Sequence, residues 1–193
     1  MSEWDETIAG RIRRGEPRAF DELFERWGAR LLAYLEGLVR ERAAAEDLLQ
    51  ETFVRVWRHI GRYEERGAFR AWLYRTATNL ALSELRRRRI ANARPLGDEA
   101  LEVAEPREGP EARAAGRARD AAVARALASL DDEHRVVVLL RVREEMSVRD
   151  VARVLNVPEG TVKSRMHHAV RRLRAAIEEE PSPPDREEPC HDV

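Results

Sequence analysis

The stretch 147–174, SVRDVARVLNVPEGTVKSRMHHAVRRLR, decides the fold. Its first half carries apolar residues at i, i+3, i+4 and i+7, namely Val148, Val151, Ala152 and Leu155. This spacing predicts a short helix with one apolar face. Ser147 is placed to cap that helix, with Asp150 three residues on as in a capping box. Asn156 tolerates the left-handed conformation in which many helices end.

The second half of the stretch predicts another helix with two unlike faces. Pro158 suits its first position, and Glu159 suits the positive end of its dipole. Its inner face carries Val162, Met166, Val170, Leu173 and Ile177. Its outer face carries Lys163, Ser164, Arg165, His167, His168, Arg171, Arg172 and Arg174. Such side chains neutralise phosphates and read base edges, so we interpret the stretch as a DNA-binding helix-turn-helix. A solvated basic helix in a bundle is the alternative.

Composition limits the class of protein. The chain has 193 residues, 37% of them charged, yet its net charge is only −1, so a nucleic-acid partner requires segregated cations. They are segregated: residues 86–89 are four arginines, whereas 97–111 and 178–192 are acidic. No apolar run is long enough to span a membrane, no signal peptide is evident, and Cys190 has no disulfide partner. We expect an all-α cytoplasmic protein.

The first half of the chain predicts three helices after a polar lead-in at 1–16. The first runs from Pro17 to about Arg40, and a turn at 41–44 precedes the second, which ends near Ile60. The third follows a loop at 61–67. Their apolar faces, which include Phe24 in the first helix and Trp57 in the second, are core by default. Arg75, Asn79, Ser83 and Arg86 share one polar face of the third helix. Aromatic residues with Arg and Asn suit unstacked bases, although Phe69 and Trp72 at i, i+3 are more often core.

Residues 93–119 are rich in Ala, Pro, Gly and Glu, which predicts a flexible linker between two small helical domains, 1–92 and 120–177. In the second domain, Asp131 is expected to cap a helix that includes 136–140, despite the β-branched residues there. The acidic tail 178–193 is expected to be disordered.

Four blocks carry a resemblance to a known family. They are AEDLLQETFVRVWR, FRAWLYRTATNLALSELRRRR, LASLDDEHRVVVLLR and the opening stretch, in that order. Together they resemble an extracytoplasmic-function (ECF) sigma factor of bacterial RNA polymerase, over about 17–92 and 120–177. The first two blocks are similar to region 2 of that family and the last two to region 4.

For region 2, the resemblance implies two surfaces. The second helix would pack on the coiled coil of the polymerase β′ subunit through Asp47, Leu48, Gln50, Glu51, Phe53 and Trp57. The loop and third helix would capture a base of the melted −10 element, through Tyr63, Arg66, Phe69, Trp72, Arg75, Asn79 and Arg86. Taking a base out of the stack costs a few kcal/mol, which pocket contacts must offset.

For region 4, the resemblance implies that the second helix of the turn motif enters the major groove of the −35 element. The expected contacts are Arg141, Thr161, Lys163, Ser164, Arg165, His167, His168, Arg171 and Arg172. The family often has an aromatic residue and then Arg where this chain has His167 and His168. Neutral His reads bases weakly.

The resemblance also implies its partners: core polymerase (β′ coiled coil and β flap), promoter DNA and an anti-sigma factor. No cofactor, metal site or enzymatic activity is expected, since no catalytic set, phosphate loop or metal-ligand spacing occurs. Adjacent histidines on a helix point about 100° apart and chelate one ion poorly. Two other readings of the residues stay open: a dimeric helix-turn-helix regulator and a helical adaptor that never touches DNA.

Overall fold

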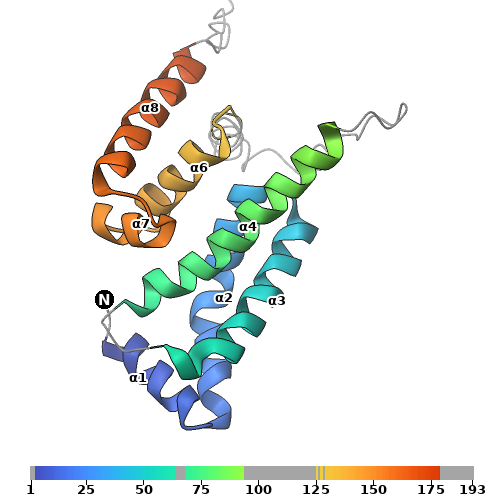
Figure 1. Cartoon of the computed structure of the whole chain (residues 1–193), viewed down its shortest axis with the longest axis vertical. Helices are drawn as coiled ribbons and strands as arrows, with labels where there is room; N and C mark the ends of the chain where they lie inside the picture. The colour runs from blue at the N-terminus through green and yellow to red at the C-terminus, as the bar shows by residue number, and fades with distance from the viewer. Residues whose placement is uncertain (1–2, 64–67, 94–124, 126, 128, 179–193) are drawn as a thin grey trace, which may run out of the picture.

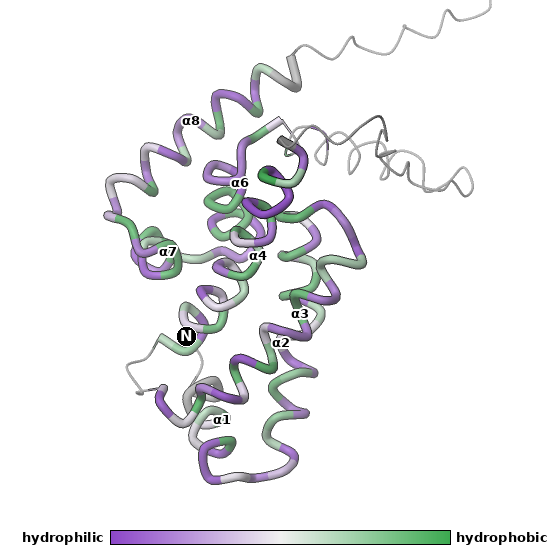
Figure 2. The backbone as a smooth tube through the Cα atoms, turned by 45° about the vertical axis from the view of Figure 1, so that its right-hand side comes forward, coloured by the Kyte–Doolittle hydropathy of each residue, from purple (hydrophilic) through white to green (hydrophobic). Residues whose placement is uncertain are grey.

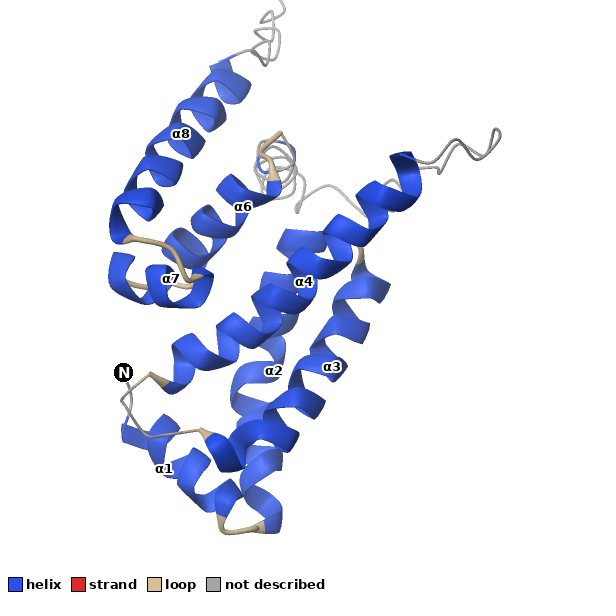
Figure 3. Ribbon diagram, viewed as in Figure 1, coloured by secondary structure: helices blue, strands red, loops and turns tan. Residues whose placement is uncertain are grey.

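The computed structural model describes residues 3–63, 68–93, 125, 127 and 129–178, and the ordered elements within these ranges are all helical (Figures 1 and 3). The all-α prediction is therefore confirmed. Much of the expected linker, the acidic tail and the loop residues 64–67 lie outside the described residues.

The chain begins with a helix, α1 (Glu3–Arg13), where we expected a polar lead-in. Its mean composition is polar, but Ile8, Ala9 and Ile12 share one face and are buried. Three apolar residues are too few to dominate the pattern, yet they are enough to anchor two helical turns. Gly15 then adopts a φ of 76° and turns the chain toward the next helix.

Helices α2 (Pro17–Val39) and α3 (Arg42–His59) pack side by side. Pro17 opens α2 at a position where no backbone N–H is needed. Arg40 ends it in the left-handed conformation (φ 60°), and its N–H donates to the carbonyl of Glu36 at 2.8 Å. The turn between the helices is therefore shorter than the expected 41–44. A 3₁₀ turn, η1 (Ile60–Arg62), follows α3.

Helix α4 (Phe69–Ala93) crosses the molecule and packs against α1, α2 and α3 (Figure 1). Inside this bundle Tyr34 and Thr78 share a buried hydrogen bond of 2.7 Å between their hydroxyls. Burial raises the pKa of Tyr34, which keeps its hydroxyl protonated.

The second domain contains α6 (Asp132–Val138), the π-helical turn η3 (Leu139–Arg143), α7 (Val148–Leu155) and α8 (Glu159–Glu178). The helical prediction for 136–140 is confirmed, although the chain widens to a π turn at Leu139. Asp131 caps α6 by accepting from the N–H of His134 at 3.0 Å, as predicted.

The helix-turn-helix is confirmed in detail. Ser147 Oγ accepts from the N–H of Asp150 at 3.1 Å, and Asn156 is left-handed with φ 54° and ψ 47°. Pro158 precedes α8 by one residue, and its carbonyl accepts from the N–H of Val162 at 3.3 Å. The prediction for Pro158 was thus displaced by one position, because proline here supplies the capping carbonyl.

The two domains share one continuous apolar core. α7 packs against α4, while η3 and α6 contact α2. Figure 2 shows α8 standing away from the first domain. The sequence predicts two tethered domains but not this contact between them.

Candidate nucleic-acid interface

The outer face of α8 is exposed as predicted. Lys163, Ser164, His167, His168 and Arg171 all lie at the surface. Among the described residues, Lys163, Ser164 and Arg171 make no ion pair or side-chain hydrogen bond, so they are available to a ligand. Thr161 is half-buried near the start of the helix. This face combines a hydroxyl, an ammonium and imidazoles, which are groups that contact base edges and phosphates in the major groove.

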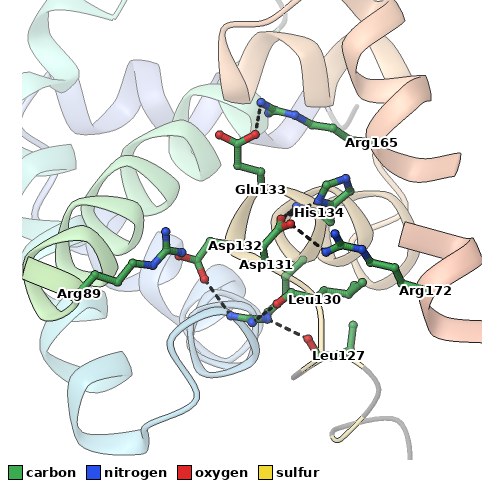
Figure 4. Close-up of polar contacts among 10 residues, drawn as sticks. Arg89, Leu127, Leu130, Asp131, Asp132, Glu133, His134, Arg165 and Arg172 are labelled. Atoms are coloured by element: carbon green, nitrogen blue, oxygen red, sulfur yellow. Dashed lines mark hydrogen bonds and ion pairs between the residues drawn. The ribbon is translucent and has the colours of Figure 1, made fainter. Parts of the chain in front are cut away.

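Two arginines of α8 already have partners. Arg165 pairs with Glu133 at 2.6 Å, and Arg172 pairs with Asp131 at 3.0 Å (Figure 4). Partial burial of Asp131 opposes ionisation, but the hydrogen bonds from His134 and the nearby charge of Arg172 lower its pKa. Both carboxylates sit at the N-terminal end of α6, where the helix dipole favours them. A DNA phosphate must therefore compete with a carboxylate for these two arginines.

Arg141 has a structural role in this conformation. It is half-buried, and its guanidinium donates to the carbonyl of Met146, just before the cap of α7. The phosphate contact that the resemblance implies for Arg141 would have to share or replace this hydrogen bond.

The predicted polar face of α4 is also present. Arg75, Asn79, Ser83 and Arg86 are all exposed. None of them makes an ion pair or side-chain hydrogen bond with another described residue. The other arginines near the end of α4 are engaged: Arg87 and Arg88 pair with Glu84, and Arg88 also reaches Glu41 at 2.6 Å. Arg89 pairs with Asp132 of the second domain (Figure 4).

The aromatic residues expected at the −10 surface lie inward. Phe69 is 0% exposed and Tyr63 only 8%, and their ring centroids are 5.6 Å apart. Trp72 is half-buried and packs on both rings, at 5.1 Å from Tyr63 and 5.8 Å from Phe69. In this conformation neither Phe69 nor Tyr63 offers a face to a base, because both rings are buried against the bundle. Arg66 lies outside the described residues.

The outward face of α3 carries Asp47 and Gln50, both exposed, and Glu51, half-buried and paired with Arg55 at 2.7 Å. Leu48 and Phe53 are buried, so they support this face rather than form it. A groove of about 600 Å³ runs between this face and α4, lined by Asp47, Leu48 and Glu51 on one side and Ser83 and Arg87 on the other.

Trp57 departs from its predicted inward position, because 54% of it is exposed. Its ring stands edge-on to Phe20 at 5.1 Å, and Phe20 in turn meets Phe53 at 5.9 Å. Phe24, which we placed in the core, is 46% exposed beside Phe53. Periodicity does not identify Phe24 as part of this exposed group, since its spacing in α2 is that of a core residue. Exposed aromatics grouped in this way mark a protein-binding surface.

In the described part of the chain, no three His, Cys, Asp or Glu side chains are placed to hold a metal ion. None of its helices is long and apolar enough to cross a membrane.

Comparison with known proteins finds a family match for each of the two domains. Residues 23–90 match the sigma-70 region 2 family, and residues 120–173 match sigma-70 region 4. The RNA polymerase sigma-H factor of Pseudomonas aeruginosa is 32% identical over 187 residues, covering 91% of this chain and 95% of that protein. The ECF RNA polymerase sigma factor SigL of Mycobacterium tuberculosis is 34% identical over 160 residues, covering 81% and 88%.

This chain belongs to the ECF family of RNA polymerase sigma factors.

A solved structure agrees with this assignment. CnrH, determined in complex with the cytosolic domain of CnrY, is similar with a TM-score of 0.70 and 26% sequence identity. The match covers 93% of this chain and 100% of CnrH. The ECF sigma factor described here therefore has the promoter-recognition function of its family. The two alternatives, a simple regulator and an adaptor, leave the region 2 match without an explanation.

The two family matches divide the exposed side chains of this sigma factor between its domains. Asn79 of α4 and the aromatic surface of α3 fall within region 2, whereas Lys163 of α8 falls within region 4. The chain thus carries one exposed polar helix face in each region and one exposed aromatic surface.

Proposed function

We propose that this sigma factor reads the −35 element as duplex DNA through α8 and the −10 element as melted DNA through α4. The observation that carries the proposal is the pair of exposed polar faces, one on each domain, whose members have few competing partners. Lys163, Ser164, His167 and His168 face the bases of the major groove, with Thr161 and Arg171 toward the phosphates. Arg141, Arg165 and Arg172 join them once they release their present partners.

At the −10 element, Asn79 hydrogen-bonds an unstacked base while Arg75 and Arg86 contact the backbone. Stacking and pocket contacts worth about 1–3 kcal/mol per base offset the cost of unpairing. With Tyr63 and Phe69 packed inside, stacking falls to Trp72 and Arg66.

Core RNA polymerase binds the surface made by Asp47, Gln50, Glu51 and Trp57 of α3, which Leu48 and Phe53 support from beneath. In the family this surface meets the β′ coiled coil, and region 4 meets the β flap. The protein works in the cytoplasm with the polymerase and contributes binding rather than catalysis. An anti-sigma factor is a further proposed partner, in line with the capture of CnrH together with the cytosolic domain of CnrY.

Transcription in vitro tests the proposal. Purified core polymerase, this protein and fragmented host genomic DNA should give transcripts whose 5′ ends share two upstream elements. Asn79→Ala should still bind polymerase but should lose promoter melting, seen as reduced permanganate reactivity of −10 thymines. Normal melting by this variant would remove Asn79 from the site, and the absence of any new start would refute the proposal as a whole.

A further inference from the structure

A buried carboxylate lies at the junction of the two domains. Glu144 follows η3 in region 4 and is only 2% exposed. Its carboxylate lies 3.4 Å from Arg30 Nη2 of α2 and 3.4 Å from Arg70 Nη2 of α4. The hydroxyl of Tyr74 donates to the same carboxylate, and Arg70 also donates to the carbonyl of Glu144. All three side-chain partners come from region 2.

Region 2 surrounds this carboxylate with a matching set of groups. The guanidinium groups of Arg30 and Arg70 lie over the Trp27 ring, 5.5 and 5.7 Å from its centroid. Burial and the adjacent Glu144 raise the pKa of Tyr74, so its hydroxyl stays protonated and can donate. Trp27 Nε1 and Arg70 Nε are buried and have no hydrogen-bond partner among the described residues. The pocket therefore supplies more donors than one carboxylate uses.

Glu144 needs these partners, because an unpaired buried carboxylate is strongly unfavourable. Two cations and a phenol make the burial of Glu144 tolerable only while the domains touch. When the domains part, Glu144 returns to water, whereas Arg70 and Tyr74 keep an empty pocket on region 2. The stability of the junction thus depends on this charge as well as on the shared apolar core.

Other contacts across the junction are compatible with the same arrangement. Arg135 donates to the carbonyl of Leu38 at 3.2 Å, and Arg89 pairs with Asp132 (Figure 4). Gly37 of α2 lies against Leu139, close enough that an added Cβ would be 3.1 Å from its Cδ2. Close packing and complementary charge therefore both occur at the junction of the two domains.

We propose that Arg30, Arg70 and Tyr74 form a carboxylate-binding site on region 2, whose ligand is Glu144 of region 4, and that this pairing holds the free protein closed. The consequence for transcription rests on the proposed function. Two elements at least one and a half duplex turns apart are separated by about 50 Å. A compact chain of this size has a radius of gyration of about 16 Å. The closed molecule cannot reach both elements, so the carboxylate must leave its site before initiation.

The test measures the distance between the domains in the full chain. Dyes are attached at Arg58→Cys on α3 and Arg149→Cys on α7, in a Cys190→Ser background, and energy transfer is recorded for single molecules. The parent should populate mainly the high-transfer state. Glu144→Gln should shift the ratio of closed to open molecules by about tenfold or more, as expected for a lost hydrogen-bonded charge.

The matched control is Glu145→Gln. Glu145 is the next residue, is exposed, and makes no ion pair with any described residue, so the same change in net charge should leave the ratio unaltered. Arg30→Gln, at the half-exposed mouth of the site, should open the protein less than Glu144→Gln does. If circular dichroism shows that Glu144→Gln has lost helix, Arg30→Gln provides an independent test of the site. The site is refuted if folded Glu144→Gln matches Glu145→Gln, or if the parent is already open.

A second arm separates this inference from the proposed function. With core polymerase held limiting, Glu144→Gln should initiate at lower sigma concentrations than the parent does. If it opens but initiates no better, closure has no regulatory role and that part of the proposal fails. If no variant initiates, including the parent, the proposed function fails, while the distance measurement still decides whether the site exists.

Discussion

Single side chains on α8 differ in what they can report about DNA. Lys163 is exposed, unpaired among the described residues and directed away from the core, so DNA is free to take it without breaking a native contact. Arg165, two residues on, must first leave Glu133. Lys163 therefore adds binding energy when it contacts DNA, whereas Arg165 exchanges one partner for another.

Lys163→Ala should therefore weaken promoter binding by about 1–3 kcal/mol if Lys163 reads a base, and only for promoters that carry the preferred −35 base. Binding of the holoenzyme to a set of −35 variants, measured by fluorescence anisotropy at fixed salt, checks this. An equal loss on every promoter, with a shallower salt dependence, would make Lys163 a phosphate contact instead.

Helix caps show how far local sequence determines the elements. The end of α7 at Asn156 and the caps at Ser147 and Asp131 were predictable, because each depends on one or two side chains and on backbone a few residues away. The position of Trp57 was not, because periodicity marks which residues share a face but not where the covering helix stops. The same limit applies to Tyr63 and Phe69, which are buried against each other and against Trp72.

The cap of α7 gives a test at this scale. Ser147→Ala removes an acceptor for the N–H of Asp150 and should lower the free energy of unfolding by about 1 kcal/mol. Urea denaturation followed by circular dichroism measures it. Ser164→Ala, an exposed serine with no capping role, is the control and should change stability by less than about 0.5 kcal/mol. Equal effects of the two substitutions would contradict the capping account.

The aromatic surface formed by α3 and α2 gives another test by substitution. Trp57→Ala should leave stability nearly intact, because 54% of the side chain is exposed, yet it should weaken polymerase binding by about 2 kcal/mol or more. Phe53→Ala should instead destabilise the fold by about 3–5 kcal/mol, since Phe53 is only 4% exposed. Titration of labelled protein with core polymerase, alongside urea unfolding, distinguishes the two. Normal binding by Trp57→Ala would place the polymerase elsewhere.

At the scale of the whole molecule, the contact between the domains was beyond prediction from sequence. Glu144 has the pattern of an ordinary surface carboxylate next to Glu145, and nothing local indicates which of the two is buried. Its partners lie 70, 74 and 114 residues away in the chain. Helix α1 was missed for a related reason, because its three apolar residues can be identified as core only when the packing of the bundle is known.

Two glycines of α2 test whether this closed arrangement governs stability. A Cβ at Gly28 would meet only Phe24 of the same helix, at an ordinary 3.5 Å, so Gly28→Ala should raise the free energy of unfolding by about 0.5–1 kcal/mol through helix propensity. A Cβ at Gly37 would come within 3.1 Å of Leu139 across the junction, so Gly37→Ala should lose that gain. Urea unfolding of both variants measures the difference. An equal gain at Gly37 would mean either that Leu139 shifts at little cost or that it does not contact Gly37 in solution. Hydrogen exchange of the α7 amides in the parent and in Gly37→Ala decides between these explanations. Slow exchange in both proteins fits a closed junction in which Leu139 shifts, whereas fast exchange already in the parent fits domains that are apart.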